Sequence, residues 1–101
     1  MELTLMYFDG CPNWHEGESR LRAAMDILGI PQGDLTLRRI ETEQDARDTN
    51  FHGSPSFLRD GEDLFADASA PVGMACRVYR SDGRLSGTPT VEELRTALSQ
   101  G

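Results

Sequence analysis

The apolar positions at the start of the chain change from a nearly continuous run to a helical period. Residues 2–8 (ELTLMYF) are mostly apolar and aromatic, which is typical of a buried strand. From about residue 12 to residue 28, apolar side chains recur at three-, four- and seven-residue steps, which predicts an amphipathic helix. Pro12 suits the first turn of this helix because its missing N–H has no partner there, and Gly29 is a natural stop.

Several shorter elements are expected beyond this helix. In chain order they are a strand over 34–40, a polar helix over 42–50, a strand over 56–58 that returns as a hairpin through Leu64 and Phe65, a strand over 76–79, and a last helix. Asp60-Gly61 is the hairpin signal, and Asp82-Gly83 predicts a second turn. Thr90-x-x-Glu93 is a capping box that opens the last helix.

This order of elements predicts a single α/β domain over residues 1–101. A strand–helix–strand beginning requires a parallel pair of strands, and the hairpin adds antiparallel ones. We therefore expect a mixed sheet of about four to five strands flanked by three helices. The length of 101 residues matches one domain, and 38% apolar residues are enough for one modest core.

Charge and composition exclude several classes of function. Seventeen acidic and ten basic residues give a net charge of -7, which argues against nucleic acid or a membrane surface as a partner, because both are bound by clustered Lys and Arg. No apolar run approaches the length of a membrane-spanning helix, and the N-terminus has the pattern of a strand rather than a signal peptide. Two cysteines without an export signal favour a cytoplasmic protein over a disulfide scaffold. No nucleotide-binding motif or zinc-ligand spacing is present, so we expect no cofactor and no metal.

Cys11 is the strongest candidate for chemistry. It follows a buried strand and precedes a helix, where unpaired backbone N–H groups and the helix dipole stabilise an anion. Such a position favours the thiolate, which is the reactive form of cysteine. Asp9 acts in the opposite direction, because a neighbouring carboxylate disfavours a second negative charge. The alternative interpretation is a small buried residue at a turn.

Two segments resemble the thioredoxin-like superfamily. The run Tyr7–Trp14 (YFDGCPNW) is similar to the active-site entry of that family, in which a strand delivers a Cys-x-x-Cys or Cys-x-x-x motif to a helix. The run Gly53–Phe57 (GSPSF) is similar to the segment before the family's third strand, where a cis proline lies against the active-site cysteine. The resemblance implies that Pro55 is cis and that the Ser54 backbone faces Cys11 and binds an extended substrate. Pro12, Trp14, Ser54 and Pro55 are then the expected substrate-binding residues.

The chain departs from the family at the second cysteine of the motif. Trp14 stands where the resolving cysteine is usual, so a local Cys-x-x-Cys disulfide is impossible. Trp14 either packs beneath the helix or forms a wall of a substrate site. Cys76 is the only other thiol. Either it approaches Cys11, to form a disulfide or hold a soft metal ion, or it is a small core residue.

The whole-chain pattern is also similar to a group of short bacterial proteins described as alkylmercury lyase-like. The resemblance rests on the Asp-Gly-Cys-Pro start and on the later Val-Gly-x-x-Cys-Arg-Val-Tyr segment. Organomercurial lyases use two cysteines and an aspartate, and Cys11, Cys76 and either Asp9 or Asp67 are residues of those types here. His15 either relays a proton near Cys11 or is an exposed helix residue.

The leading hypothesis is a thioredoxin-like thiol protein, a candidate thiol–disulfide oxidoreductase. Its reactive thiol, Cys11, would exchange with a small thiol such as glutathione or mycothiol, or with a protein disulfide. Release from the mixed disulfide would then come from Cys76 or from an external thiol. The alternatives are a non-catalytic binding module of the same fold and a protein that binds a soft metal or an organomercurial through Cys11 and Cys76. The oligomeric state stays open, because the Leu64-Phe65 hairpin is either an exposed edge or internal.

Overall fold

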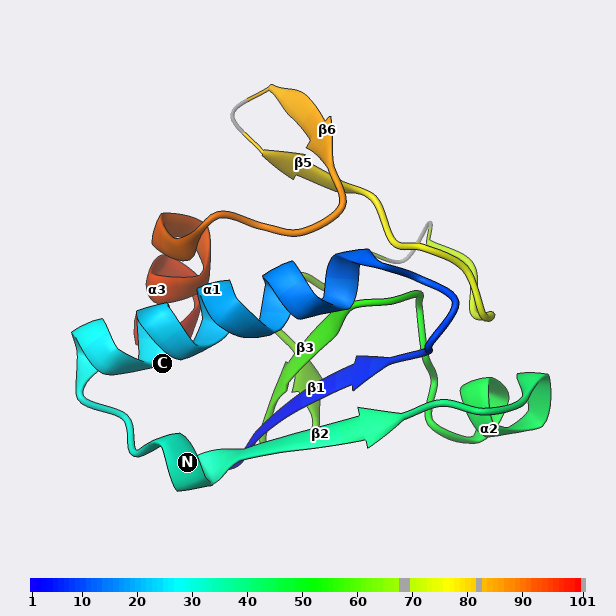
Figure 1. Ribbon diagram of the computed structural model, residues 1–101, viewed down its shortest axis with the longest axis horizontal. Helices are drawn as coiled ribbons and strands as arrows, with labels where there is room; N and C mark the ends of the chain where they lie inside the picture. Colours follow the sequence, from blue (N-terminus) through cyan, green and yellow to red (C-terminus); the bar gives the residue numbers. More distant parts are fainter. Residues whose placement is uncertain (68–69, 82, 101) are drawn as a thin grey trace.

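A four-stranded sheet with helices packed against it forms the body of the protein (Figure 1). The computed structural model describes residues 1–67, 70–81 and 83–100. The elements in chain order are β1 (Leu3–Tyr7), α1 (Asn13–Leu28), a 3₁₀ turn (Gln32–Asp34), β2 (Leu35–Arg39), α2 (Glu43–Asp48), β3 (Ser56–Arg59), β4 (Glu62–Asp63), β5 (Tyr79–Ser81), β6 (Arg84–Ser86) and α3 (Val91–Ser99). Over the described residues, the predicted mixed α/β class with three α-helices is confirmed.

The sheet has the order β2-β1-β3-β4, with β1 and β3 inside. β1 pairs in parallel with β2 and antiparallel with β3, and β3 pairs antiparallel with β4. The strand–helix–strand beginning therefore forms the expected parallel pair. Asp60 and Gly61 form the expected hairpin turn, and both have positive φ angles, of 50° and 86°, as tight hairpin turns require.

The two faces of β1 pack against different helices because side chains alternate along a strand. Leu3 and Leu5 join the main core with Leu21 of α1 and Leu94 of α3, and α1 and α3 lie together over this face (Figure 1). Met6 points to the other face and joins a smaller cluster, whose other buried members are Ile40, Ala46 and Phe51. This second cluster holds α2 and the chain that leads to β3.

The helix ends follow the local sequence signals. Gly29 ends α1 in the left-handed conformation, with φ of 72°. The Thr42 side chain caps α2 by accepting a hydrogen bond from the Asp45 N–H. Thr90 and Glu93 form the predicted capping box of α3.

The predicted strand over 76–79 is wrong in its extent. β5 begins only at Tyr79, and Cys76 makes a single isolated parallel bridge with Ser54. β5 pairs only with β6, in a two-stranded ribbon separate from the main sheet, so the sheet has four strands over the described residues. The second predicted turn falls partly on residue 82, which lies outside the described residues.

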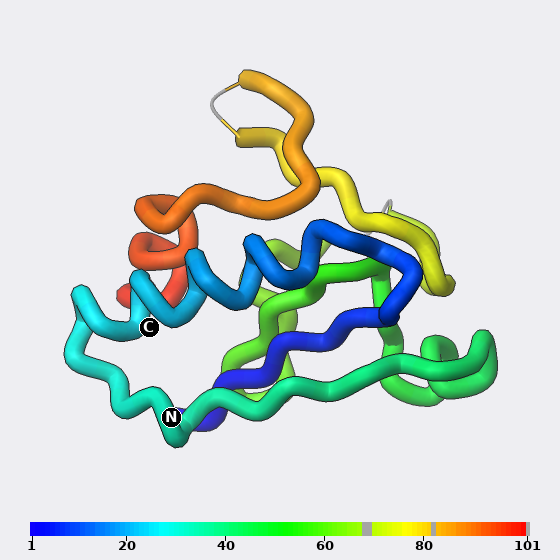
Figure 2. The backbone as a smooth tube through the Cα atoms, viewed as in Figure 1, coloured from blue at the N-terminus to red at the C-terminus, as the bar shows by residue number. Residues whose placement is uncertain are grey.

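The β5–β6 hairpin rises beyond α1, and the segment before it runs past the beginning of α1 (Figures 1 and 2). This segment therefore lies beside the loop that joins β1 to α1, although the two are far apart in the sequence. Over the described part of the chain, no helix has the length and apolar character needed to cross a membrane.

Candidate functional site

Cys11 lies in the loop between β1 and α1, one residue before the N-cap Pro12. Its backbone N–H donates to the Phe8 carbonyl oxygen at 3.2 Å, which closes a tight turn after the strand. Its side chain is completely buried, and its sulfur lies 3.4 Å from the Ser54 carbonyl oxygen, in donor geometry. The thiol therefore faces into the protein, toward the loop before β3.

The Ser54–Pro55 peptide bond is cis, the conformation that the resemblance implied. The Ser54 hydroxyl accepts a hydrogen bond from the Phe8 N–H at 3.3 Å, and both Ser54 and Pro55 are buried. Gly17 of α1 packs directly on this loop, since a Cβ at that position would lie 3.1 Å from Pro55 Cγ. The glycine that weakens the helix in isolation thus allows α1 to approach the cis proline.

The chain's own residues 75–77 pair with the Ser54 backbone. The Ser54 N–H donates to the Ala75 carbonyl oxygen at 2.9 Å, and the Arg77 N–H donates to the Ser54 carbonyl oxygen at 2.9 Å. Gly53, with φ of 110°, lets the two segments approach, because a Cβ there would lie 3.0 Å from the Ala75 oxygen. Both backbone groups that were expected to bind an extended substrate are therefore occupied by an internal segment.

This pairing brings the two free cysteines together. The Cys76 sulfur lies 2.6 Å from the Cys11 sulfur and is placed as the hydrogen-bond donor of the pair. Cys76 is exposed, whereas Cys11 beneath it is buried, so the interpretation of Cys76 as a small core residue is wrong. The hydrogen bond to Cys11, with some desolvation and the charge of the neighbouring sulfur, raises the pKa of Cys76 from 9.0 to about 11.

The side chain of Arg77, the next residue, anchors the segment to β3, to β4 and to the chain after β4. Its side chain is 5% exposed, and Nη1 donates to Asp63 Oδ2 at 2.6 Å and to the Ser56 hydroxyl at 3.3 Å. Nη2 donates to the Phe65 carbonyl oxygen. The guanidinium also lies 4.8 Å from the centre of the Tyr79 ring, in a cation–π arrangement.

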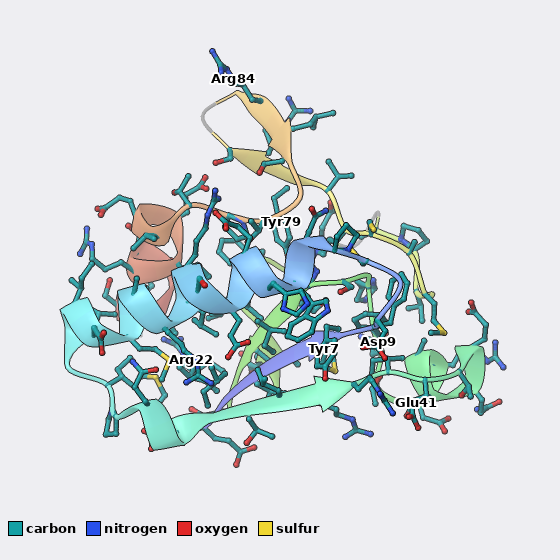
Figure 3. All side chains as sticks on the ribbon, viewed as in Figure 1. Tyr7, Asp9, Arg22, Glu41, Tyr79 and Arg84 are labelled. Atoms are coloured by element: carbon teal, nitrogen blue, oxygen red, sulfur yellow. The ribbon has the colours of Figure 1, made fainter. Side chains whose placement is uncertain are left out.

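Tyr79 provides a second anchor, between the hairpin and α1 (Figure 3). Its hydroxyl donates to the carbonyl oxygen of Pro55 at 2.5 Å, and burial raises the pKa of this phenol. Sequence reasoning missed both Arg77 and Tyr79. In the run Arg77-Val78-Tyr79, nothing in the local pattern indicates that the arginine is buried and the valine is exposed. The Cys76 segment is thus tied to the cis-proline loop by main-chain and side-chain bonds.

Comparison with protein-family models, curated proteins and solved structures found no match for this chain.

The remaining residues of the expected substrate site lie at the start of α1. Pro12 is exposed. Trp14 is half-buried and stacks on Tyr7, with ring centres 4.0 Å apart, and on His15, with ring centres 3.7 Å apart. Trp14 also packs against the edge of the main core. His15 is exposed, and its ring partner is Trp14.

The carboxylate of Asp9 is directed to β2. Asp9 is exposed and pairs with Arg39 at 3.1 Å, beside Glu41 (Figure 3). Arg39 also pairs with Glu41, and both carboxylates hold the pKa of this guanidinium above its usual value. The charge of Asp9 is therefore balanced by a partner on the neighbouring strand.

A pocket of about 400 Å³ opens beside the exposed cysteine. Its lining residues come from the loop after α2, the segment after β4 and the hairpin: His52, Phe65, Asp67, Ala70, Pro71, Ala75, Cys76, Arg77, Val78, Tyr79 and Arg80. His52 is held in place because its Nδ1 lies 2.8 Å from the Ala70 carbonyl oxygen. Within the described ranges, no three His, Cys, Asp or Glu side chains gather where they could hold a metal ion.

Proposed function

We propose that this chain is a thioredoxin-like dithiol protein in which Cys11 and Cys76 form a reversible disulfide. The observation that carries the proposal is the 2.6 Å approach of two free thiols that are 65 residues apart in the sequence. Backbone bonds to Ser54 maintain this approach, so it does not depend on flexible side chains alone. Cys76 supplies the second thiol that the local motif lacks, because Trp14 stands where the second cysteine is usual.

The arrangement of elements supports the thioredoxin-like part of the proposal. A strand, a helix and a parallel strand are followed by an antiparallel hairpin, β3–β4. A cysteine stands between β1 and α1, and a cis proline stands directly before β3. These are the two landmarks on which the resemblance rests, and they meet at one point of the fold.

The hydrogen bond between the thiols favours different roles for the two sulfurs. Cys76 keeps its proton up to a pKa of about 11 and donates it toward Cys11. Cys76 is therefore the thiol of the pair that holds its proton more tightly than a free cysteine does. In the exchange, the protein disulfide and two external thiols give the protein dithiol and one external disulfide.

Oxidised glutathione is a suitable probe of the proposal. The reduced protein is mixed with it, remaining thiols are alkylated, and the intact mass is measured. The wild-type chain should lose both alkylation sites and carry no glutathione, because the second cysteine expels it. Cys11→Ser should stop at a glutathione adduct on Cys76, and Cys76→Ser, whose remaining thiol is buried, should form its adduct more slowly and stop there. Two alkylatable thiols in the wild type, or an adduct that is never resolved, would contradict the proposal and favour a binding module.

A further inference from the structure

The segment around Cys76 occupies the place of a bound substrate strand. The main-chain N–H and carbonyl of Ser54, which an extended substrate would need, already bond to Ala75 and Arg77. Between these two residues, Cys76 presents its sulfur to Cys11. The contact therefore has the form of an enzyme cysteine facing a substrate cysteine, with both supplied by one chain.

Burial alternates strictly along the six residues from Cys76 to Ser81. Cys76, Val78 and Arg80 are exposed, and the residues between and after them are buried. This alternation is the side-chain period of an extended chain, so the three exposed residues share an outer face. Leu85 pairs with Arg80 in the hairpin and belongs to the same face, where it is 70% exposed.

An external molecule can reach only one of the two sulfurs without a change in the backbone. Cys76 is exposed and lines the pocket of about 400 Å³, together with Val78 and Arg80. Cys11 is fully buried beneath it. Access to Cys11 would require the release of Ala75 and Arg77 from the Ser54 backbone, and the buried side chain of Arg77 opposes that release.

We propose that exchange with substrate takes place at the sulfur of Cys76, and that Cys11 is the buried resolving thiol. This inference rests on the proposed function and assigns its two steps. An external thiolate attacks the Cys76 sulfur of the protein disulfide, the Cys11–Cys76 bond breaks, and Cys11 leaves as a thiolate. A second external thiolate then attacks the external sulfur of the mixed disulfide, and Cys76 leaves with the electron pair and takes up a proton. The reverse sequence oxidises the protein.

The same outer face indicates the class of substrate. Arg80 is exposed and forms no ion pair with any described residue, in a protein of net charge -7. The pocket volume lies in the range of small-ligand pockets. The geometry points to a small thiol or disulfide that carries a negative charge near its sulfur. Asp67 also lines the pocket, so the attraction is local to Arg80 rather than spread over the whole lining.

The first test compares the two single-cysteine variants with the dianionic aromatic disulfide of the Ellman assay. Cys76 in Cys11→Ser should react at least about tenfold faster than Cys11 in Cys76→Ser, because the latter must first open two backbone hydrogen bonds. The faster variant should keep the aryl group on Cys76. Faster reaction of Cys11 would overturn the assignment.

The wild-type chain in the same assay tests the proposed function separately. It should release two aryl thiols per molecule, one in the attack by Cys76 and one when Cys11 closes the disulfide. Release of only one would contradict the Cys11–Cys76 couple whatever the order of reactivity. Release of two together with a faster Cys11 would retain the couple and reverse the roles.

The second test concerns the substrate class. Arg80→Glu should lower the reaction rate with the dianionic probe several-fold relative to the rate with neutral dithiodipyridine. Arg84→Glu is the matched control, since Arg84 carries the same charge and points away from the body at the tip of the hairpin (Figure 3). An equal change in both variants, or none in Arg80→Glu, would overturn a local role of Arg80.

Discussion

Replacing Asp63 with asparagine tests whether the buried Arg77–Asp63 ion pair anchors the Cys76 segment. Asp63 uses its two oxygens separately: Oδ2 accepts from Arg77 at 2.6 Å, and Oδ1 accepts from the Phe65 N–H at 2.9 Å. An amide has only one oxygen, so the substituted side chain cannot accept both hydrogen bonds. Asp63→Asn therefore leaves the Arg77 guanidinium, which is 5% exposed, without its counter-charge.

The expected loss follows from the burial of the pair. Removal of one partner of a buried ion pair costs about 3–5 kcal/mol, because it leaves an uncompensated charge. Asp63 keeps 18% of its side chain exposed, and Arg77 keeps its bonds to Ser56 and Phe65. We therefore expect a loss of about 3 kcal/mol, at the low end of that range. A domain of this size is stable by about 5–15 kcal/mol, so the variant should still fold.

Urea denaturation of the reduced protein measures this loss. Glu92→Gln is the matched control, because it makes the same chemical change in the exposed Glu92–Arg95 pair of α3. Exposed pairs contribute up to about 1 kcal/mol. If Asp63→Asn costs no more than Glu92→Gln, Arg77 is not a desolvated anchor, and the argument that the Cys76 segment is held in place is refuted.

Three further results are expected. Gly17→Ala should destabilise the protein by about 1 kcal/mol in urea, because a Cβ lying 3.1 Å from Pro55 costs more than helix propensity returns. Gly33→Ala, with no atom within 4 Å of the added Cβ, should stabilise it by about 0.4–1 kcal/mol, and equal effects would contradict this reasoning. A pH titration followed by thiolate absorbance should give Cys76 a pKa of about 11 in the wild type and a pKa closer to 9.0 in Cys11→Ala. Because this pKa is raised by folding, the reduced protein should lose stability as pH rises from 9.0 to about 11. A Cys76→Ser variant should lose less over this range, with the loss that remains due to the buried Tyr79, whose pKa is also raised. Oxidation should raise the free energy of unfolding by about 4 kcal/mol, since the Cys11–Cys76 bond closes a loop of 65 residues, and a reductant should abolish the gain.

The elements that could be predicted from the sequence are those specified by neighbouring residues. The capping box of Thr90 and Glu93 and the stop at Gly29 depend on bonds within a few positions. The period of α1 and the apolar run of β1 each specify one buried face. Local signals of this kind were sufficient for the mixed α/β class, for the three α-helices and for the place of Cys11 before a helix, whereas β6 and the 3₁₀ turn were not predicted.

The contact between the cysteines could not be predicted in this way. Cys76 is 65 residues from Cys11 and follows an irregular segment, so no periodicity relates the two. The run Cys76–Tyr79 also reverses the usual rule, because Val78 is 62% exposed and Arg77 is buried. Arg77 is buried because acceptors from β3, β4 and the chain after β4 surround it. That reason is tertiary, and it is absent from the local pattern.

The anchoring of the segment bears directly on the proposed redox chemistry. A disulfide forms readily when the reduced thiols are already held together, because little chain entropy is then lost on closure. Here the two main-chain bonds of Ser54 and the buried Arg77 hold Cys76 over Cys11 before any bond forms. Loss of the Arg77 anchor would let Cys76 move away and would expose Cys11. Asp63→Asn should therefore lower the reactivity advantage of Cys76 over Cys11 toward a small disulfide, in the same variant whose stability measures the anchor.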